Sequence, residues 1–232
     1  MRKILGSLAC IAAMLFFLFP VGNASADFFD LCKIGTPEQV ADAIKAGANV
    51  NDVEKEQNDY SGCTPLMIAA QYNTNPDVIM ELLNAGANVN AVDYFGGSTP
   101  LMNATYNSNP AVAEVLITAG ANVNARDYFS DTPLMCAAQN KNDRSVVISL
   151  IKAGAELNTL NNNDNTALDF AKSYNNSQIE TVLLNAGAES GVSISSKNLW
   201  NGLFVALLGF FVAILGIVVL IKYLRRSRIS ST

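Results

Sequence analysis

The hexapeptide Ala-Gly-Ala-Asn-Val-Asn occurs three times in this 232-residue chain, at 46–51, 85–90 and 119–124. Diverged copies follow at 153–158 and 186–190, so successive Ala-Gly-Ala triplets lie 39, 34, 34 and 33 residues apart. A second motif keeps this period: Thr-Pro-Leu-Met begins at 64, 99 and 132, and Thr-Ala-Leu-Asp begins at 166. Two independent motifs with one period predict a chain built from stacked structural repeats.

The segment 99–128 predicts the structure of one repeat. Thr99-Pro100 is typical of a helix start, because the hydroxyl can cap the helix and proline suits its first turn. Asn109-Pro110 gives the same signal for a second helix, whose apolar residues follow at helical spacing. Gly120 is expected to end that helix in a left-handed conformation. The repeat is therefore predicted to be helix, turn, helix and extended hairpin.

The asparagines of the hexapeptides are expected to be structural. Short polar side chains in turns hydrogen-bond to nearby backbone groups. We expect them to join neighbouring turns through side chain–backbone hydrogen bonds. The residues concerned are Asn49, Asn51, Asn88, Asn90, Asn122 and Asn124.

This order of motifs strongly resembles the ankyrin-repeat family, over roughly 28–190. The resemblance implies an all-α ankyrin-repeat solenoid of about five repeats, to which a C-terminal transmembrane helix is added below. The repeats would span about 28–60, 61–94, 95–128, 129–162 and 163–190. The chain departs from the family pattern where Met67, Met102 and Met135 replace its histidine and Ser130 and Asp164 replace its turn glycine. An extra stretch at 54–57 lengthens the first hairpin.

Residues 1–26 have the features of a secretory signal peptide. Arg2 and Lys3 precede an apolar run from Ile4 to Val21, and Ala24-Ser25-Ala26 matches a small-x-small cleavage site. Cleavage after Ala26 is expected, which would leave an ankyrin-repeat domain beginning at residue 27. An uncleaved N-terminal anchor is the alternative.

A second apolar segment predicts a membrane span. Leu203–Ile221 contains no charged or polar side chain, and its nineteen residues would form a helix of about 28 Å, the thickness of a bilayer core. We assign 191–200 as a linker and 201–222 as the span. The basic tail 223–232 predicts a cytoplasmic C-terminus, which places the repeats outside the cytoplasmic membrane. A glycosylation sequon within a predicted helix, at Asn103, favours a bacterial source and a periplasmic domain.

Small residues recur along one side of the predicted span. Their spacing of 4, 3, 4 and 3 is the period of a left-handed helix pair, and small side chains allow close approach in lipid. This predicts a homo-oligomer or a membrane-protein partner, although chance alignment of common residues is the alternative. The residues are Gly202, Ala206, Gly209, Ala213 and Gly216.

Charge and residue types exclude several functions. Segment 27–198 has 9 Lys and Arg against 20 Asp and Glu, a net charge of −11, which repels nucleic acid. The chain has no histidine, so it has neither a Ser–His nor a Cys–His nucleophile and no histidine-bound metal. Cys32, Cys63 and Cys136 have the spacing of neither a disulfide framework nor a zinc site. No catalytic residue, metal or cofactor is predicted, and Asp52, Glu54 and Glu56 are expected on a solvated hairpin.

The aromatic residues are the candidate binding residues. Tyr60, Tyr94 and Tyr128 recur at the predicted hairpin tips, and three further tyrosines fall near the ends of first helices. In the ankyrin family these two places line the concave face that recognises partners. The alternative is that the tyrosines were duplicated with the repeats or pack between them. The candidate residues are Tyr60, Tyr94, Phe95, Tyr128, Phe129, Tyr72, Tyr106 and Tyr174.

Together these features predict a non-catalytic scaffold that binds a protein or peptide and is anchored outside the cytoplasmic membrane by one C-terminal helix. One alternative is a receptor-like sensor of a peptide or small ligand that acts through association of its membrane helix. An enzyme of an unrecognised kind is the other alternative, and the missing motifs oppose it.

Overall fold

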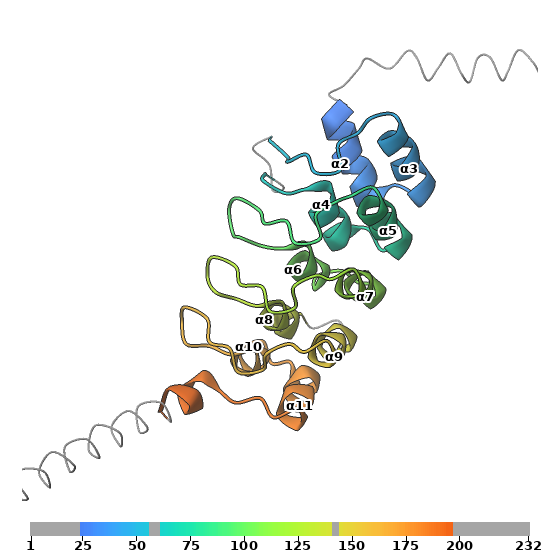
Figure 1. Ribbon diagram of the computed structural model, residues 1–232. Coiled ribbons are helices and arrows are strands. Elements are labelled where there is room, and N and C mark those ends of the chain that lie inside the picture. Colours follow the sequence, from blue (N-terminus) through green and yellow to red (C-terminus); the bar gives the residue numbers. More distant parts are fainter. Residues whose placement is uncertain (1–23, 56–60, 141–143, 197–232) are drawn as a thin grey trace, which may run out of the picture.

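The computed structural model describes residues 24–55, 61–140 and 144–196. This part of the chain is helical, with turns and hairpins but no β-strand, in agreement with the predicted all-α class. Helices pair within each repeat, and the repeats stack in chain order (Figure 1). The helices are α2 (Ala24–Ile34), α3 (Pro37–Lys45), α4 (Pro65–Tyr72), α5 (Pro76–Asn84), α6 (Pro100–Ala104), α7 (Pro110–Thr118), α8 (Pro133–Gln139), α9 (Ser145–Lys152), α10 (Ala167–Ser173) and α11 (Ser177–Asn185).

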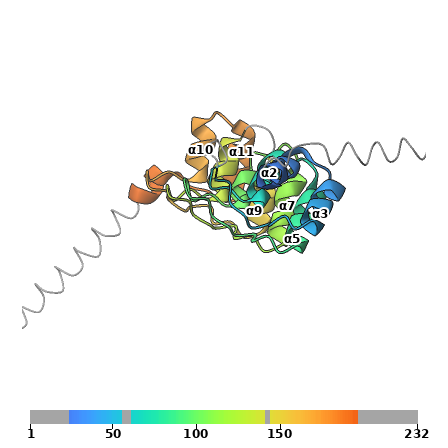
Figure 2. The same ribbon diagram turned by 90° about the horizontal axis from the view of Figure 1, so that it is seen from above.

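The two helices of each repeat form separate rows. The first helices α2, α4, α6, α8 and α10 pack on one another in order, as do the second helices α3, α5, α7, α9 and α11. The hairpins project on the side of the first helices (Figure 1). Seen along the stack, successive hairpins lie one behind another (Figure 2). This arrangement creates one continuous surface of hairpin tips and first-helix ends, which we call the hairpin face.

A capping threonine directly precedes each first helix after α2. Thr99 has an extended backbone, and its hydroxyl oxygen accepts a hydrogen bond from the N–H of Met102, which lacks a partner inside the helix. Thr64, Thr132 and Thr166 do the same for α4, α8 and α10. Asn109 caps α7 in this way, as predicted from its Asn-Pro pair. The sequence signals for helix starts are therefore confirmed.

The Ala-Gly-Ala triplet ends each second helix. In α7 the N–H of Gly120 donates to the carbonyl of Ile117 at 3.1 Å, and the N–H of Ala121 donates to Leu116 at 3.0 Å. These two bonds form a Schellman motif, which requires a left-handed residue at its centre. Gly120 has φ 88°, and Ala121 is buried. The triplet recurs because each second helix needs the same stop, with a left-handed glycine and a small buried residue after it.

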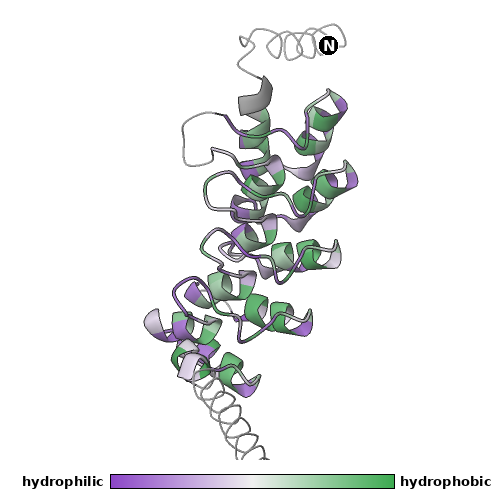
Figure 3. Cartoon of the chain, turned by 60° about the vertical axis from the view of Figure 1, so that its left-hand side comes forward, coloured by the Kyte–Doolittle hydropathy of each residue, from purple (hydrophilic) through white to green (hydrophobic). Residues whose placement is uncertain are grey.

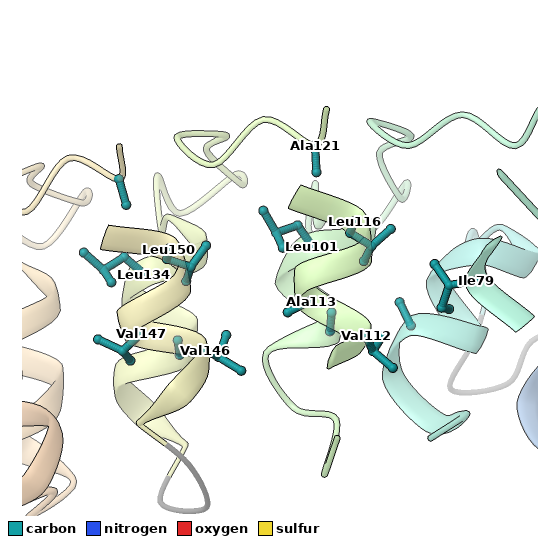
Figure 4. Packing of buried hydrophobic residues seen from close by; sticks show 14 of the residues in the cluster. Ile79, Leu101, Val112, Ala113, Leu116, Ala121, Leu134, Val146, Val147 and Leu150 are labelled. Carbon is teal, nitrogen blue, oxygen red and sulfur yellow. The ribbon is translucent and has the colours of Figure 1, made fainter. Parts of the chain in front are cut away.

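Hydrophobic residues at equivalent positions form one continuous core. Val112 and Leu116 lie on the side of α7 towards Ile79 of the preceding repeat (Figure 4). Leu101 lies on the other side, towards Leu134 and Leu150 of the following repeat. These side chains are almost fully buried, and each buried leucine contributes about 1.5–3 kcal/mol relative to exposure. Hydrophobic residues are concentrated in the helices (Figure 3). Each repeat therefore covers its apolar side only with a neighbour of the same shape.

Three details differ from the sequence expectations. Helix α2 begins at Ala24, before the expected start of the first repeat at residue 28. Residues 191–196 are helical, within the segment assigned as a linker. Glu54 is buried and not solvated. Its N–H donates to the carbonyl of Cys63, and its own carbonyl accepts from the N–H of Gly62.

Several predictions fall outside the described residues. No helix in the described part of the chain is long and apolar enough to cross a membrane. The apolar run of the predicted signal, the predicted span 201–222 with its small-residue side, the tail 223–232 and Tyr60 all lie outside that part. These predictions stay untested.

Candidate functional site

Asparagines on the hexapeptides join neighbouring repeats, as expected. The Asn51 amide donates to the carbonyl of Gly86 at 2.9 Å, and its Oδ1 accepts from the N–H of Asn88 at 2.9 Å. Asn90 makes the same pair of bonds, to the carbonyl of Gly120 and from the N–H of Asn122. Asn124 makes it with the carbonyl of Gly154 and the N–H of Glu156. The first asparagine of each hexapeptide has a local role, because Asn49, Asn88 and Asn122 accept from the N–H two residues later. The hairpin stems are therefore fixed relative to one another.

A second row of asparagines, mostly buried, was not predicted from the sequence. The Asn107 amide donates to the carbonyls of Ala70 and Asn73, both at 2.9 Å, and so joins the third repeat to the second. Asn73, Asn140 and Asn176 also donate to carbonyls of the preceding repeat. The signal was available, since Asn73, Asn107 and Asn140 recur at intervals of 34 and 33. These bonds fix the first-helix ends, where the tyrosines lie.

Aspartate side chains shape the hairpin tips. Asp93 Oδ1 accepts from the backbone N–H groups of Phe95, Gly96 and Gly97 at 2.8, 2.7 and 3.3 Å, and its Oδ2 accepts from Ser98 at 2.9 Å. Asp127 and Asn161 have the equivalent role in the next two hairpins. The aspartates that precede Tyr94 and Tyr128 therefore hold the turns that present these two rings.

Adjacent tips are also joined directly. The N–H of Tyr128 donates to the carbonyl of Gly96 at 2.8 Å, and the N–H of Asn162 donates to Phe129 at 3.0 Å. The Asn162 amide adds a bond to the carbonyl of Tyr128 at 3.1 Å. Backbone bonds of this kind limit independent movement of the tips, so the aromatic residues on them are presented in a fixed arrangement.

Two tip tyrosines cover glycines of the preceding hairpin. A Cβ atom added to Gly97 would lie 2.6 Å from the Tyr128 ring, and one added to Gly62 would lie 3.2 Å from Cβ of Tyr94. The rings therefore occupy space that only glycine leaves open. The alternative of packing between repeats is correct in part for these two tyrosines. Even so, Tyr94 is 70% exposed and Tyr128 is 60% exposed.

The same tip position has a left-handed backbone in four hairpins. Gly62 and Gly97 have φ of 82° and 75°, and the residues that replace the family glycine, Ser130 and Asp164, have φ of 64° and 57°. Aspartate tolerates this conformation better than most residues, whereas serine is strained there. Ser130 and Asp164 therefore keep the left-handed conformation of the family's turn glycine, and for Ser130 this conformation costs free energy.

The exposed aromatic residues gather on the hairpin face. Phe95 is 74% exposed and Phe129 is 62% exposed, each beside a tip tyrosine. The ends of first helices add Tyr72, Tyr106 and Tyr174, which are less exposed. Every large aromatic side chain that the described part of the chain exposes therefore belongs to this face.

The end of the first helix of the third repeat brings a tyrosine close to a buried thiol. Partial burial raises the pKa of Tyr106, and the neighbouring Cys136 thiol, Tyr174 and Asp131 add to the increase. Burial also raises the pKa of Cys136 to about 12, with Asp131 and Asp127 contributing. The prediction that Cys136 is a buried apolar residue is confirmed.

The two other thiols in the described part of the chain also have raised pKa values. Burial raises the pKa of Cys32 to about 12 and that of Cys63 to about 11, where Asp93 and Glu54 contribute as well. Since the thiolate is the nucleophilic form of cysteine, these raised pKa values disfavour a nucleophilic role. Within the described residues no three His, Cys, Asp or Glu side chains are grouped so that they could hold a metal ion.

Helix pairs stacked in register, with a fixed surface of hairpin tips, define a helical-repeat protein. A family model described as "Ankyrin repeats (3 copies)" matches residues 29–127, and one described as "Ankyrin repeats (many copies)" matches 116–171. The two matches together cover more than half of the chain, and the chain belongs to the ankyrin-repeat family. Comparison with curated proteins gives no match. An array of ankyrin repeats is a protein–protein interaction module.

The structure brings together most of the predicted site residues. Tyr94, Phe95, Tyr128 and Phe129 lie on adjacent joined tips, while Tyr72, Tyr106 and Tyr174 lie along the ends of the first helices. Tyr174 is displaced from strict equivalence, because an extra residue, Asn175 with φ 54°, separates it from Asn176. Whether these residues bind a partner is not tested by their placement.

Proposed function

We propose that the hairpin face captures a protein or peptide partner without catalysis. The observation that carries this proposal is the row of exposed rings on adjacent tips, namely Tyr94, Phe95, Tyr128 and Phe129. Contiguous exposed aromatic side chains are uncommon on a surface without a partner, and aromatic residues dominate the binding energy of interfaces. The bonds between tips add to this, because a surface that is already ordered loses little entropy on binding.

The two phenylalanines are the best residues for a test. Tyr94 and Tyr128 cover glycines, so their removal would also disturb the hairpins, whereas Phe95 and Phe129 are the more exposed member of each pair. Crosslinking in intact membranes followed by mass spectrometry would identify a partner of the full chain. The double variant Phe95→Ala/Phe129→Ala should lose that partner, since central aromatic anchors often contribute about 2 kcal/mol or more each.

A matched control removes exposed apolar side chains from the second helices. Met80 of α5 and Leu184 of α11 are both exposed and lie in the row of helices away from the hairpins. The variant Met80→Ala/Leu184→Ala should keep the crosslinked partner, and both double variants should keep the thermal unfolding temperature within a few degrees. Retention of the partner by the phenylalanine variant would show that binding takes place elsewhere.

The proposed location is outside the cytoplasmic membrane, with a single C-terminal span. It rests on the apolar segment Leu203–Ile221, within the predicted span 201–222, and on the basic residues that follow this segment. A reporter fused after Thr232 should be active only in the cytoplasm, and one inserted after Ser196 only outside. The opposite pattern would overturn the location. Association of spans through the small residues 202–216 belongs to the same proposal, and Gly209→Ile with Ala213→Ile should weaken it in a membrane reporter assay.

A further inference from the structure

In the third and fourth repeats, acidic residues outnumber basic ones on the hairpin face. The hairpins and first helices of the third and fourth repeats, residues 91–107 and 125–140, contain the acidic Asp93, Asp127 and Asp131 and the basic Arg126. The Arg126 guanidinium donates to the carbonyl of Leu160 at 2.6 Å and keeps its positive charge, so three aspartates against one arginine give these two segments a net charge of −2. The next hairpin adds the exposed Asp164. Negative charge therefore accompanies the aromatic row across adjacent repeats.

The acidic residues lie close to the rings. Asp127 precedes Tyr128 and Phe129 in one tip, and Asp131 is close enough to Tyr106 to influence its pKa. Burial raises the pKa of Asp127, and the negative charges of Asp131 and Asp93 raise it further, although backbone N–H groups oppose this increase. A cation bound here would reduce the repulsion among these carboxylates. Its attraction to them would be stronger than in bulk water, because the site is partly desolvated.

One ring of the face already interacts with a cation of the chain itself. Lys33 of α2 places its Nζ 5.0 Å from the centre of the Tyr72 ring, within the range of a cation–π contact. Tyr106 and Tyr174 occupy similar places near the ends of later first helices, where their rings are exposed. This contact shows that the geometry of a first-helix tyrosine suits an ammonium or guanidinium group.

We propose that the partner presents an extended segment in which Lys or Arg side chains alternate with apolar ones. The apolar side chains would pack on Phe95 and Phe129, and the cations would lie between Tyr106, Asp127 and Asp131. The segment would be extended because the tips follow one another along the stack and offer equivalent positions in successive repeats. This inference rests on the proposed binding function and names the chemistry of its partner.

Selection from a random dodecapeptide phage library on the immobilised full chain tests the inference. The selected peptides should be enriched in Lys, Arg and apolar residues and depleted in Asp and Glu relative to the starting library. The variant Asp127→Asn/Asp131→Asn keeps the hydrogen-bond acceptors of both side chains and removes their charge. Peptides selected on the wild type should bind it roughly tenfold more weakly, as expected for loss of charge-assisted contacts.

The control removes two acidic side chains from the second helices. Glu81 of α5 and Glu114 of α7 lie away from the hairpins, so Glu81→Gln/Glu114→Gln lowers the net negative charge equally. It should leave peptide affinity within twofold. Equal weakening by both variants would mean that the peptides respond only to net charge, and the inference would be wrong.

The remaining outcomes separate the inference from the function on which it rests. If the selected peptides are acidic or neutral, or if no peptide is enriched, the inference of a basic partner segment is wrong. The proposed binding of a partner by the hairpin face would not be affected by that result. If basic peptides bind Phe95→Ala/Phe129→Ala as tightly as the wild type, and that variant also retains its crosslinked partner, the proposed function itself fails.

Discussion

The buried asparagine row gives the sharpest test of how the repeats are held together. Asn107 makes two donated bonds, to the carbonyls of Ala70 and Asn73 at 2.9 Å, and accepts one from the N–H of Asn109 at 2.9 Å. Asn107→Ala would remove all three and leave two carbonyls without a partner inside the protein. A typical bond contributes about 1 kcal/mol, and an unsatisfied buried group costs about 1–3 kcal/mol. We expect the free energy of unfolding to fall by about 3 kcal/mol.

The measurement is urea unfolding of the repeat domain, residues 27–196, followed by circular dichroism. A loss of this size corresponds to a melting temperature lower by roughly 10 °C for a domain of this length. The midpoint should fall with an unchanged slope if the domain still unfolds as one unit. A lower slope would indicate that repeats on the two sides of Asn107 unfold separately.

The control is Asn90→Ala on the outer row. Asn90 also makes two bonds to the following repeat, to the carbonyl of Gly120 at 3.4 Å and from the N–H of Asn122 at 2.8 Å, but these lie in solvent. Water can replace its side chain, so the loss should be about 1 kcal/mol or less. Equal losses for the two variants would refute the argument that burial, and not the number of bonds, decides the effect.

Three further predictions concern the backbone and one carboxylate. Gly120→Val should destabilise the domain by about 1–3 kcal/mol in urea unfolding, because the backbone φ of 88° strains a β-branched residue. The added side chain would meet no neighbouring atom, so strain is the only cause, and an unchanged midpoint would contradict this prediction. Ser130→Gly should raise stability by about 0.5–1 kcal/mol by relieving φ 64°, and a decrease would show that the serine side chain has a structural role. Burial alone would raise the pKa of Asp169, but hydrogen bonds from Gly191, Thr166 and Ser190 outweigh it and lower the pKa. A lowered folded-state pKa gives stability that is present above the ordinary value of 3.8 and is lost as the pH falls through the folded value, so Asp169→Asn should flatten the acid side of a stability-against-pH curve.

Asp169 also determines where the domain ends. Its carboxylate holds Ser190 and Gly191 at 2.7 Å each, and the helical turn 191–196 follows directly. A Cβ atom on Gly191 would overlap the carbonyl oxygen of Asp164, so the chain after the last repeat folds back on the last hairpin. The linker predicted from 191 therefore begins within an ordered closing segment.

The sequence by itself determined the repeat, its period, and the helix starts and the helix end of the segment 99–128, because those features are set by local physical chemistry. A capping threonine, a proline in the first turn and a left-handed glycine act within a few residues of their own position. Thr99, Gly120 and their equivalents were therefore correctly assigned. The ankyrin architecture followed, since identical units of this shape can cover their apolar sides only by stacking.

The tertiary structure alone decided which polar side chains join the repeats and what surrounds the tip tyrosines. Asn107 and Asn90 are both asparagines in turns, yet one is buried against the preceding repeat and the other is exposed at the surface. Tyr128 covers Gly97, which lies 31 residues earlier, and no local pattern connects the two. Contacts between repeats depend on how far each unit rotates on its neighbour, and that rotation is set by the packing of whole helices.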